Sequence, residues 1–199
     1  MKLICSLTSP YARRVRVLAH ELGVADQIDI EIVKPRESSD HLWTINPIGK
    51  IPTLQLKNGS AIYDSLIICD YLIDTFSPGW GINEQADYWA YRTRLSLLNQ
   101  IGDAGSQSRK LAMQDPPQQK AAEFQLNKIQ RGLTHIENTW PSLETELSTA
   151  SIGLGCTFDY LLYRLPEIDW ATTYPRISKW FSTFHKRESM RMTQIPTLS

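Results

Sequence analysis

Residues 46–54 read Asn-Pro-Ile-Gly-Lys-Ile-Pro-Thr-Leu, and this stretch decides how the first third of the chain folds. Its first four residues carry the breakers that are typical of a loop. Pro52 cannot donate a hydrogen bond to a strand ladder, so it suits a turn or a sheet edge, and the bond before it can be cis or trans. Two short apolar runs follow at 53–56 and 61–63, and Asn58-Gly59 between them predicts a β-hairpin.

Strand and helix signals surround this stretch on both sides. The apolar residues 2–6 indicate a short strand. From Val15 to Leu22 apolar residues recur at i, i+3, i+4 and i+7, which is the stripe of an amphipathic helix. Residues 28–33 alternate Ile and Val with Asp and Glu and predict a half-buried strand. A short helix over 38–43 and a helix from about Ser65 complete the order β-α-β, crossover, β-β-α, which is a compact α/β unit.

The composition changes after this unit. Residues 77–83 are rich in Gly and Pro and predict a linker, and everything beyond them reads as helical. We expect two long helices whose apolar stripes include Trp89 and Phe124, then a helix that is apolar nearly all round, then an amphipathic helix. The expected helices cover 84–113, the stretch from beyond Pro117 to about Leu147, 152–164, and the stretch behind Tyr174-Pro175. The chain is therefore predicted to hold an α/β domain over 1–76 and an all-α domain over 84–199.

The composition is that of a soluble globular protein. The 199 residues include 21 Lys and Arg and 21 Asp and Glu, so the formal net charge is zero. This balance argues against a nucleic-acid binder that relies on a general basic field. No apolar run approaches the roughly 18–20 residues of a membrane-spanning helix, and the first residues become polar too soon for a signal peptide. Cys5, Cys69 and Cys156 are widely spaced and odd in number, which predicts reduced thiols and a cytoplasmic location.

Two strand-to-helix junctions carry polar side chains that suit either a helix cap or a ligand. Ser9 follows the first strand and stands just before Pro10, where helix N–H groups and a partial positive charge favour an anion. Its hydroxyl can cap the helix or donate a hydrogen bond to a thiolate or oxyanion. Asp64-Ser65 occupies the matching place before a later helix, and at each of the two junctions taken alone a cap is the simpler interpretation.

The other reactive side chains form no catalytic pattern. A dithiol redox site needs a Cys-x-x-Cys arrangement, and the partner position of Cys5 is Thr8. The cysteines are therefore expected to be small core residues. The four histidines show no metal-ligand spacing, and there is no Gly-rich phosphate loop.

Taken together, these residues resemble the glutathione S-transferase family over essentially the whole chain. The most specific part of the resemblance is residues 46–54 followed by Gly59, Asp64-Ser65, Ile68 and Tyr71-Leu72. The opening residues 5–15 are similar to small bacterial members whose active hydroxyl stands just before a proline. The resemblance implies a thioredoxin-like N-terminal domain, an all-α bundle as the second domain, glutathione as co-substrate, no metal, and a cytoplasmic homodimer that serves detoxification.

The family assigns glutathione-binding roles to several of these positions. Pro52 would be cis, so that the backbone N–H and C=O of Ile51 pair with the cysteinyl part of glutathione like a strand edge. Asp64 and Ser65 would hold the γ-glutamyl end. The Ser65 hydroxyl and N–H suit its carboxylate, and Asp64 suits its cationic group.

The sulfur of glutathione would be met by a hydroxyl at the start of the first helix. Ser9 is the residue that matches the family motif, and Thr8 and Tyr11 are its rivals. A Cys directly before Pro10 would imply thiol transfer. Because Ser9 stands there, the resemblance favours attack on small hydrophobic electrophiles or reduction of peroxides.

The glycine carboxylate of glutathione needs a cation or a hydrogen-bond donor. Lys50, His41 and Lys34 are the candidates, and the sequence does not rank them. The electrophile would be held by apolar side chains of the all-α domain, chiefly those of its first long helix.

One position departs from the family pattern. The buried helix of the family usually opens with Ser/Thr-x-x-Asp, whose two ends cap the helix together, whereas here residues 148–151 place Ser151 at the Asp position. A serine is expected to cap less well at that place, or the cap is expected to shift along the chain.

Two classes of function fit these residues. The enzyme is favoured because Ser9, Ile51-Pro52 and Asp64-Ser65 are all present. The alternative is a non-catalytic protein that keeps the fold and acts through a macromolecular partner. It predicts normal folding without a thiolate signal.

Overall fold

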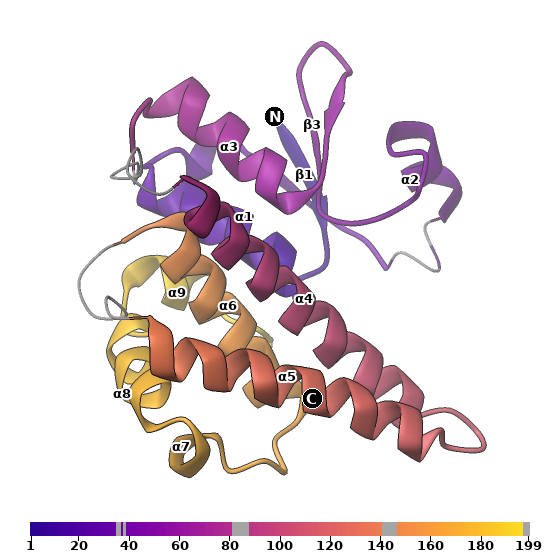
Figure 1. Ribbon diagram of the computed structural model, residues 1–199. Coiled ribbons are helices and arrows are strands. Elements are labelled where there is room, and N and C mark those ends of the chain that lie inside the picture. Colours follow the sequence, from indigo (N-terminus) through magenta and orange to yellow (C-terminus); the bar gives the residue numbers. More distant parts are fainter. Residues whose placement is uncertain (35–36, 38, 81–87, 141–146, 197–199) are drawn as a thin grey trace. The chain divides into compact units, whose positions relative to one another are not determined.

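The structure is a computed structural model that describes residues 1–34, 37, 39–80, 88–140 and 147–196 (Figure 1). The chain divides into two compact units. The first unit contains the described residues of 1–80 together with 188–196, and the second contains those of 88–187. Of the predicted linker over 77–83, positions 81–83 lie outside the described residues.

The first unit is built on a four-stranded mixed sheet in the order β2-β1-β3-β4. Its strands are β1 (Lys2–Cys5), β2 (Asp29–Ile32), β3 (Thr53–Gln55) and β4 (Ala61–Ile62). β1 runs parallel to β2 and antiparallel to β3, and β3 pairs antiparallel with β4. Gly59 between β3 and β4 has a φ of +86°, a conformation that glycine adopts without steric cost. The predicted hairpin is confirmed.

Helices cover both faces of this sheet (Figure 1). α1 (Pro10–Glu21) packs against α3 (Ser65–Phe76) on one side, and α2 (Ser39–Ile45) lies on the other side. A short 3-10 helix, η1 (Ala25–Gln27), leads into β2. The apolar cluster beneath α2 consists of Ile4, Val33 and Leu42, with Ile45 and Ile51 packed against it. This arrangement is the thioredoxin-like domain that the resemblance implies.

The second unit contains helices and no strand among its described residues. Its helices are α4 (Tyr88–Ala112), α5 (Gln119–Thr139), α6 (Thr149–Arg164), α7 (Trp170–Thr173) and α8 (Pro175–Phe184). α4 packs along both α5 and α6, and α8 packs against α5. Two parts of the predicted long helices, residues 84–87 and 141–146, lie outside the described residues. The all-α prediction for this part of the chain is confirmed.

Two glycines inside these helices allow the helices to approach closely. A Cβ atom at Gly132 of α5 would lie 2.8 Å from the side chain of Ile101 on α4. One at Gly105 of α4 would lie 2.8 Å from the side chain of Leu161 on α6. Glycine weakens a helix taken alone, but at these two places a larger residue would require the Ile101 or Leu161 side chain to move.

The last described residues return to the first unit, where α9 (Glu188–Met192) packs against α1. Arg13 of α1 is only 1% exposed, and its guanidinium donates to the carbonyl of Met190 at 3.2 Å and to the hydroxyl of Thr193 at 3.5 Å. These bonds tie the end of the chain to its first helix. The predicted boundary of the all-α domain, 84–199, differs from the observed grouping for this reason.

Several predictions of burial are wrong. Trp89 and Phe124 are 77% and 61% exposed, whereas the other apolar residues expected in the stripe of α4, Leu95 and Ile101, are buried. Ile30 and Ile32 of β2 are also exposed, although the apolar residues that flank the strand are buried. β2 is an edge strand, so its side chains lack a neighbouring strand on one side.

The cysteines are buried thiols, as the sequence predicts. Burial raises the pKa of the Cys5 thiol, and the positive charge of Arg16 offsets only part of this. A thiol of this kind is a poor source of thiolate, so Cys5 is a core residue. Among the helices that the structure describes, none is long and apolar enough to cross a membrane.

Candidate functional site

Three polar junctions meet at one edge of the sheet. Ile4 of β1 lies opposite Thr53 of β3, and Leu54 of β3 lies opposite Ile62 of β4. Because β3 is antiparallel to both neighbours, the ends of β1 and β4 adjoin the start of β3. The residues that leave β1, enter β3 and leave β4 therefore gather at this edge. They include Ser9, Ile51-Pro52 and Asp64-Ser65.

Ser9 is the N-cap of α1, and Pro10 is the first residue of the helix. The Ser9 Oγ accepts a hydrogen bond from the Ala12 N–H at 3.3 Å, which is long for such a bond. The side chain is half-buried, and its hydroxyl hydrogen has no acceptor among the described residues. Ser9 therefore caps the helix and still keeps a donor for a ligand.

The rival hydroxyls have different surroundings. The Thr8 hydroxyl lies 3.1 Å from the Ser6 hydroxyl, and the Thr8 N–H donates to Ser6 Oγ at 3.3 Å. Thr8 is thus engaged in a local turn. Tyr11 is half-buried in the first turn of α1. Of the Ser9 and Thr8 hydroxyls, that of Ser9 is the less committed to the protein, since it only accepts one long hydrogen bond.

The entry to β3 is held by a buried asparagine. The Asn46 side chain is 1% exposed, donates to the Lys50 carbonyl and the Thr53 hydroxyl at 3.0 Å each, and accepts from the Ile48 N–H at 3.2 Å. The bond between Ile51 and Pro52 is cis, as the resemblance implies. Within the described ranges, the backbone N–H and C=O of Ile51 bind no protein group. The loop therefore presents a short piece of unpaired strand edge.

Asp64 is the N-cap of α3 and Ser65 is the first residue of that helix. One carboxylate oxygen of Asp64 accepts from the Leu66 N–H at 3.0 Å, and the side chain is exposed. Ser65 is 2% exposed. The expected cap is present, and the second oxygen of Asp64 has no protein partner in the described part of the chain.

The three candidate cations differ in their partners. Lys34 pairs with Glu37, with 3.2 Å from Nζ to Oε2, and both side chains are well exposed. His41 binds Glu31, with 2.8 Å from Nε2 to Oε1. Lys50 is exposed, and no described residue forms a hydrogen bond or ion pair with its ammonium group. Of the three candidates, Lys50 can meet a ligand without first leaving a partner.

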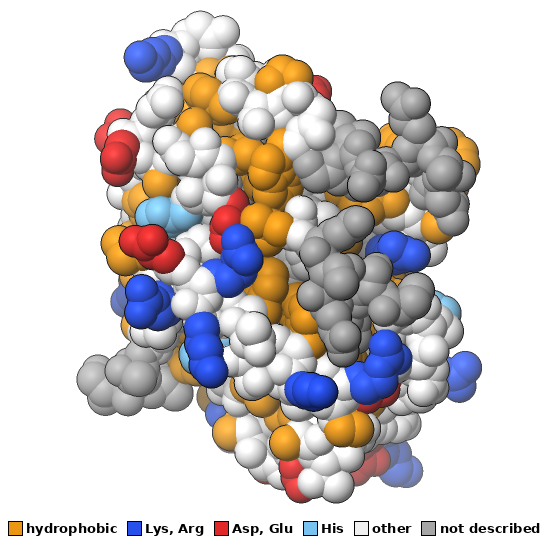
Figure 2. Space-filling model, turned by 90° about the vertical axis from the view of Figure 1, so that its left-hand side faces the viewer, with side chains coloured by type: hydrophobic (Ala, Val, Ile, Leu, Met, Phe, Trp, Pro, Cys, Tyr) orange, Lys and Arg blue, Asp and Glu red, His pale blue; other side chains and the backbone are white. Residues whose placement is uncertain are grey.

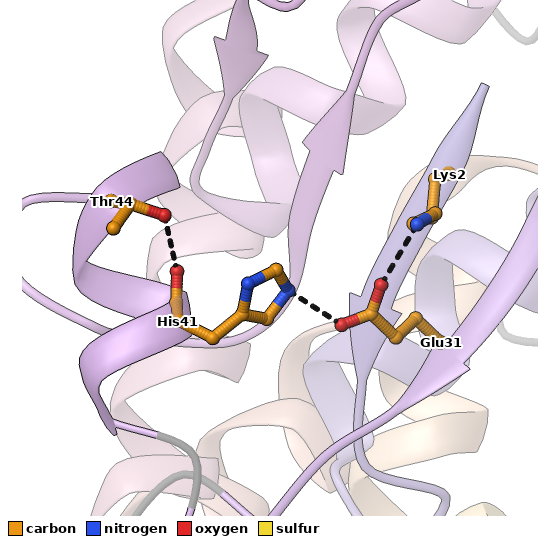
Figure 3. Close-up of polar contacts among 4 residues, drawn as sticks. All are labelled: Lys2, Glu31, His41 and Thr44. Carbon is orange, nitrogen blue, oxygen red and sulfur yellow. Dashed lines mark hydrogen bonds and ion pairs between the residues drawn. The ribbon is translucent and has the colours of Figure 1, made fainter.

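His41 and Lys2 share the carboxylate of Glu31 (Figure 3). The Lys2 ammonium lies 3.0 Å from one oxygen and the His41 imidazole 2.8 Å from the other, while the Thr44 hydroxyl donates to the His41 carbonyl at 2.7 Å. Burial acts to raise the pKa of Glu31, but hydrogen bonds from Lys2 and His41 outweigh it and hold this pKa below its usual range. His41 thus links α2 to the edge strand β2.

Sequence reasoning missed two residues that build this region. Asn46 stands before Pro47 in a loop, a pattern in which asparagine often bonds to nearby backbone, so a local signal was present. Arg13 gives no local signal, since its partner Met190 lies 177 residues away. The described residues hold no group of three or more His, Cys, Asp or Glu side chains that could bind a metal ion.

Comparison with known proteins identifies the family. Residues 8–75 match the family described as the N-terminal domain of glutathione S-transferase. A solved structure of a glutathione transferase family member from Pseudomonas fluorescens Pf-5, with bound glutathione, is 30% identical. It covers 98% of this chain and 99% of its own, with a TM-score of 0.92. The chain belongs to the glutathione S-transferase family.

Two further relatives of this glutathione S-transferase family member are similar to it over nearly the full length of both chains. A glutathione S-transferase structure from Methylobacillus flagellatus KT with glutathione bound is 31% identical, covers 98% of this chain and 99% of its own, and has a TM-score of 0.85. The uncharacterized GST-like protein YibF of Escherichia coli K12 is 29% identical over 98% of this chain and 99% of its own length. The resemblance in the sequence is confirmed at the level of the family.

Proposed function

We propose that the protein is a glutathione transferase. It binds glutathione at the sheet edge, forms the thiolate, and transfers the glutathionyl group to a small hydrophobic electrophile. The observation that carries the proposal is the gathering of three junctions, each with uncommitted hydrogen-bonding atoms, at one edge. The glutathione bound in two relatives of about 30% identity supports this choice of ligand.

The backbone of Ile51 is proposed to hold the cysteinyl part of glutathione. Its unpaired N–H and C=O can add the peptide as a short antiparallel strand. The N-terminus of α3, with Ser65 and Asp64, would hold the γ-glutamyl carboxylate and amino group. Lys50 would pair with the glycine carboxylate; Lys34 and His41 are weaker candidates because Glu37 and Glu31 already bind them.

Ser9 is proposed to stabilise the thiolate. A free thiol has a pKa of about 8.5, and lowering it by about two units requires roughly 2.7 kcal/mol. One hydrogen bond to a charged group supplies about 1.5–3 kcal/mol, and the N-terminus of α1 adds to it. The hydroxyl hydrogen of Ser9 is available for this bond because the hydroxyl acts only as an acceptor within the protein.

The thiolate then forms the new bond. Its sulfur attacks the electrophilic carbon of the second substrate, and the leaving group departs with the bonding electrons. Apolar side chains of the all-α domain would hold that substrate. Peroxides are a second class of substrate for the same thiolate, with another glutathione completing the reduction.

We also propose a homodimer in the cytoplasm. Three buried thiols without a disulfide support a reducing compartment. Apolar side chains reach the surface of the molecule, as the face in Figure 2 shows. In the first unit, Tyr63 and Ile67 are exposed. In the second, Tyr88 and Trp89 are exposed and their rings meet edge to face. Aromatic residues of this kind are enriched at protein interfaces.

Turnover tests the proposal. Conjugation of glutathione to 1-chloro-2,4-dinitrobenzene is followed by absorbance, and reduction of cumene hydroperoxide is followed in parallel. We expect a saturable rate above the uncatalysed one in at least one assay. Ser9→Ala should lower it roughly 10- to 100-fold, because it removes one charge-assisted hydrogen bond. Ser182→Ala, at an exposed serine of α8, is the control. Glutathione binding without turnover in either assay would contradict the proposed transferase activity and favour a non-catalytic binding protein.

A further inference from the structure

The outward face of α5 carries a basic stripe with one aromatic residue. Phe124, Lys128, Arg131 and His135 are spaced at i, i+4, i+7 and i+11, which places them on one side of the helix. All four are exposed. The opposite side of α5 is buried, so this face is the surface that the helix presents outside the packing of the second unit.

An open groove of about 900 Å³ follows the same face. Its described lining consists of these four residues and three uncharged polar side chains, with no carboxylate among them. In the chain that the structure describes, neither Lys128 nor Arg131 has an ion-pair partner. The groove therefore has a positive potential that no acidic residue of its own lining offsets.

The carboxylate of Glu137, further along α5, is already bound by groups of the protein. Glu137 accepts hydrogen bonds at the start of α8, from the Arg176 N–H at 2.7 Å and the Ile177 N–H at 2.9 Å, one on each carboxylate oxygen. Glu123 precedes Phe124 and lies outside the lining of the groove. The positive charge of the stripe is thus left for a ligand.

Phe124 adds an apolar contact to this charge. It is 61% exposed, and the Lys128 ammonium lies 4.7 Å from the centre of its ring. A cation over an aromatic face stabilises that arrangement, so the ring and the charge are presented together. Exposed aromatic side chains and arginine are both enriched at protein interfaces.

We propose that this face of α5 docks an acidic segment of a partner protein. Carboxylates of the segment pair with Lys128 and Arg131, the arginine being able to bind one carboxylate through two parallel hydrogen bonds. An apolar side chain of the segment packs on Phe124. A protein segment fits better than a nucleic acid because the chain has zero net charge and the exposed Phe124 ring lies beside the cations. The surface does not depend on the proposed glutathione chemistry.

Fluorescence anisotropy of the full-length protein tests the proposal. The probe is a labelled 12-residue peptide that carries Glu at helical i, i+3 and i+4 positions and one Phe. The comparison peptide has Gln in place of every Glu. We expect saturable binding of the acidic peptide alone, weakened by added salt.

Variants locate the binding. The double substitution Lys128→Glu with Arg131→Glu should weaken binding by roughly tenfold or more, since each exposed ion pair contributes a modest amount and reversal adds repulsion. Phe124→Ala, added to this double substitution, should weaken binding of the acidic peptide further. The double substitution Lys179→Glu with Lys186→Glu, an equal charge change at exposed residues in and just after α8, should leave it unchanged. Equal binding by the α5 double variant, equal binding of the Gln peptide, or tighter binding of a single-stranded oligonucleotide at these residues would overturn the proposal. Circular dichroism confirms that each variant is folded.

Discussion

Serines begin helices in both units of the molecule, and they use their side chains differently. At Ser148 the cap of α6 is closed: its Oγ accepts from the Ser151 N–H at 3.2 Å, and the Ser151 Oγ accepts from the Ser148 N–H at 2.9 Å. At Ser9 the cap of α1 is a single bond of 3.3 Å from the Ala12 N–H. The first cap is completed by protein groups, and the second leaves a donor for something else.

This difference shows that capping and binding are not exclusive interpretations of such a serine. Both residues cap a helix, as their positions in the sequence indicate. What separates them is whether a second side chain completes the hydrogen bonding. Of the two expectations at Ser151, a shifted cap is wrong, because the Ser151 hydroxyl takes the place of the Asp that the family pattern carries. A weaker cap stays a prediction.

The largest effect is expected at the open cap. Ser9→Ala should raise the pKa of enzyme-bound glutathione by about 1–2 units, because it removes a charge-assisted hydrogen bond of about 1.5–3 kcal/mol. Thiolate absorbance near 240 nm against pH gives this value. Thr8→Val and Tyr11→Phe are the matched controls. An unchanged pKa in Ser9→Ala together with a raised one in either control would transfer the role to that residue.

A substitution at the closed cap of α6 should change the stability of the protein and leave its glutathione binding unchanged. Ser148→Ala removes the acceptor for the Ser151 N–H and should lower the free energy of unfolding by about 1–2 kcal/mol. Urea unfolding measures this change, and glutathione affinity should stay as in the wild type. A loss of affinity with no loss of stability would contradict the distinction between the two caps.

A smaller gain is expected from restoring the family pattern. Ser151→Asp places a carboxylate in the first turn of α6, where it can accept from the Ser148 N–H and interact favourably with the helix dipole. The free energy of unfolding should rise by about 0.5 kcal/mol. If stability falls instead, the hydrogen bond that Ser151 donates to the Ser148 carbonyl matters more than the carboxylate would.

The smallest effect concerns an exposed cap in the second unit. The hydroxyl and N–H of Thr172 bind the Asp169 carboxylate at the start of α7 and lower its pKa. A lowered pKa in the folded state stabilises the protein above the unfolded pKa, and this contribution is lost as pH falls through the folded value. Asp169→Asn keeps an oxygen acceptor but does not titrate. The wild type should therefore lose slightly more stability than the variant between about pH 5 and pH 3, and parallel curves would refute the assignment.

Local features of the fold were predictable because local chemistry fixes them. The hairpin at Asn58-Gly59, the end of α1 before Gly23 and the starts of helices at Pro10, Asp64 and Pro175 follow from turn and cap preferences that act over a few residues. The three junctions of the candidate site belong to this class.

Features that depend on distant parts of the chain were not predictable. Arg13 lies on the side of α1 opposite the apolar stripe of Val15 to Leu22, and it is buried because Met190 and Thr193 supply acceptors. Trp89 and Phe124 fit helical stripes by spacing, but which side of a helix is covered depends on neighbours that spacing does not reveal. In the sequence His41 is equivalent to Lys50, and only the fold places the carboxylate of Glu31 beside it.

The central claim is that Ser9 and the N-terminus of α1 form a thiolate from bound glutathione. Calorimetric titration with glutathione at pH 7, in two buffers of different ionisation heat, measures affinity and proton release together. We predict binding with release approaching one proton per site in the wild type, and much less in Ser9→Ala. Failure to bind glutathione at millimolar concentration, or binding without proton release, would contradict the claim.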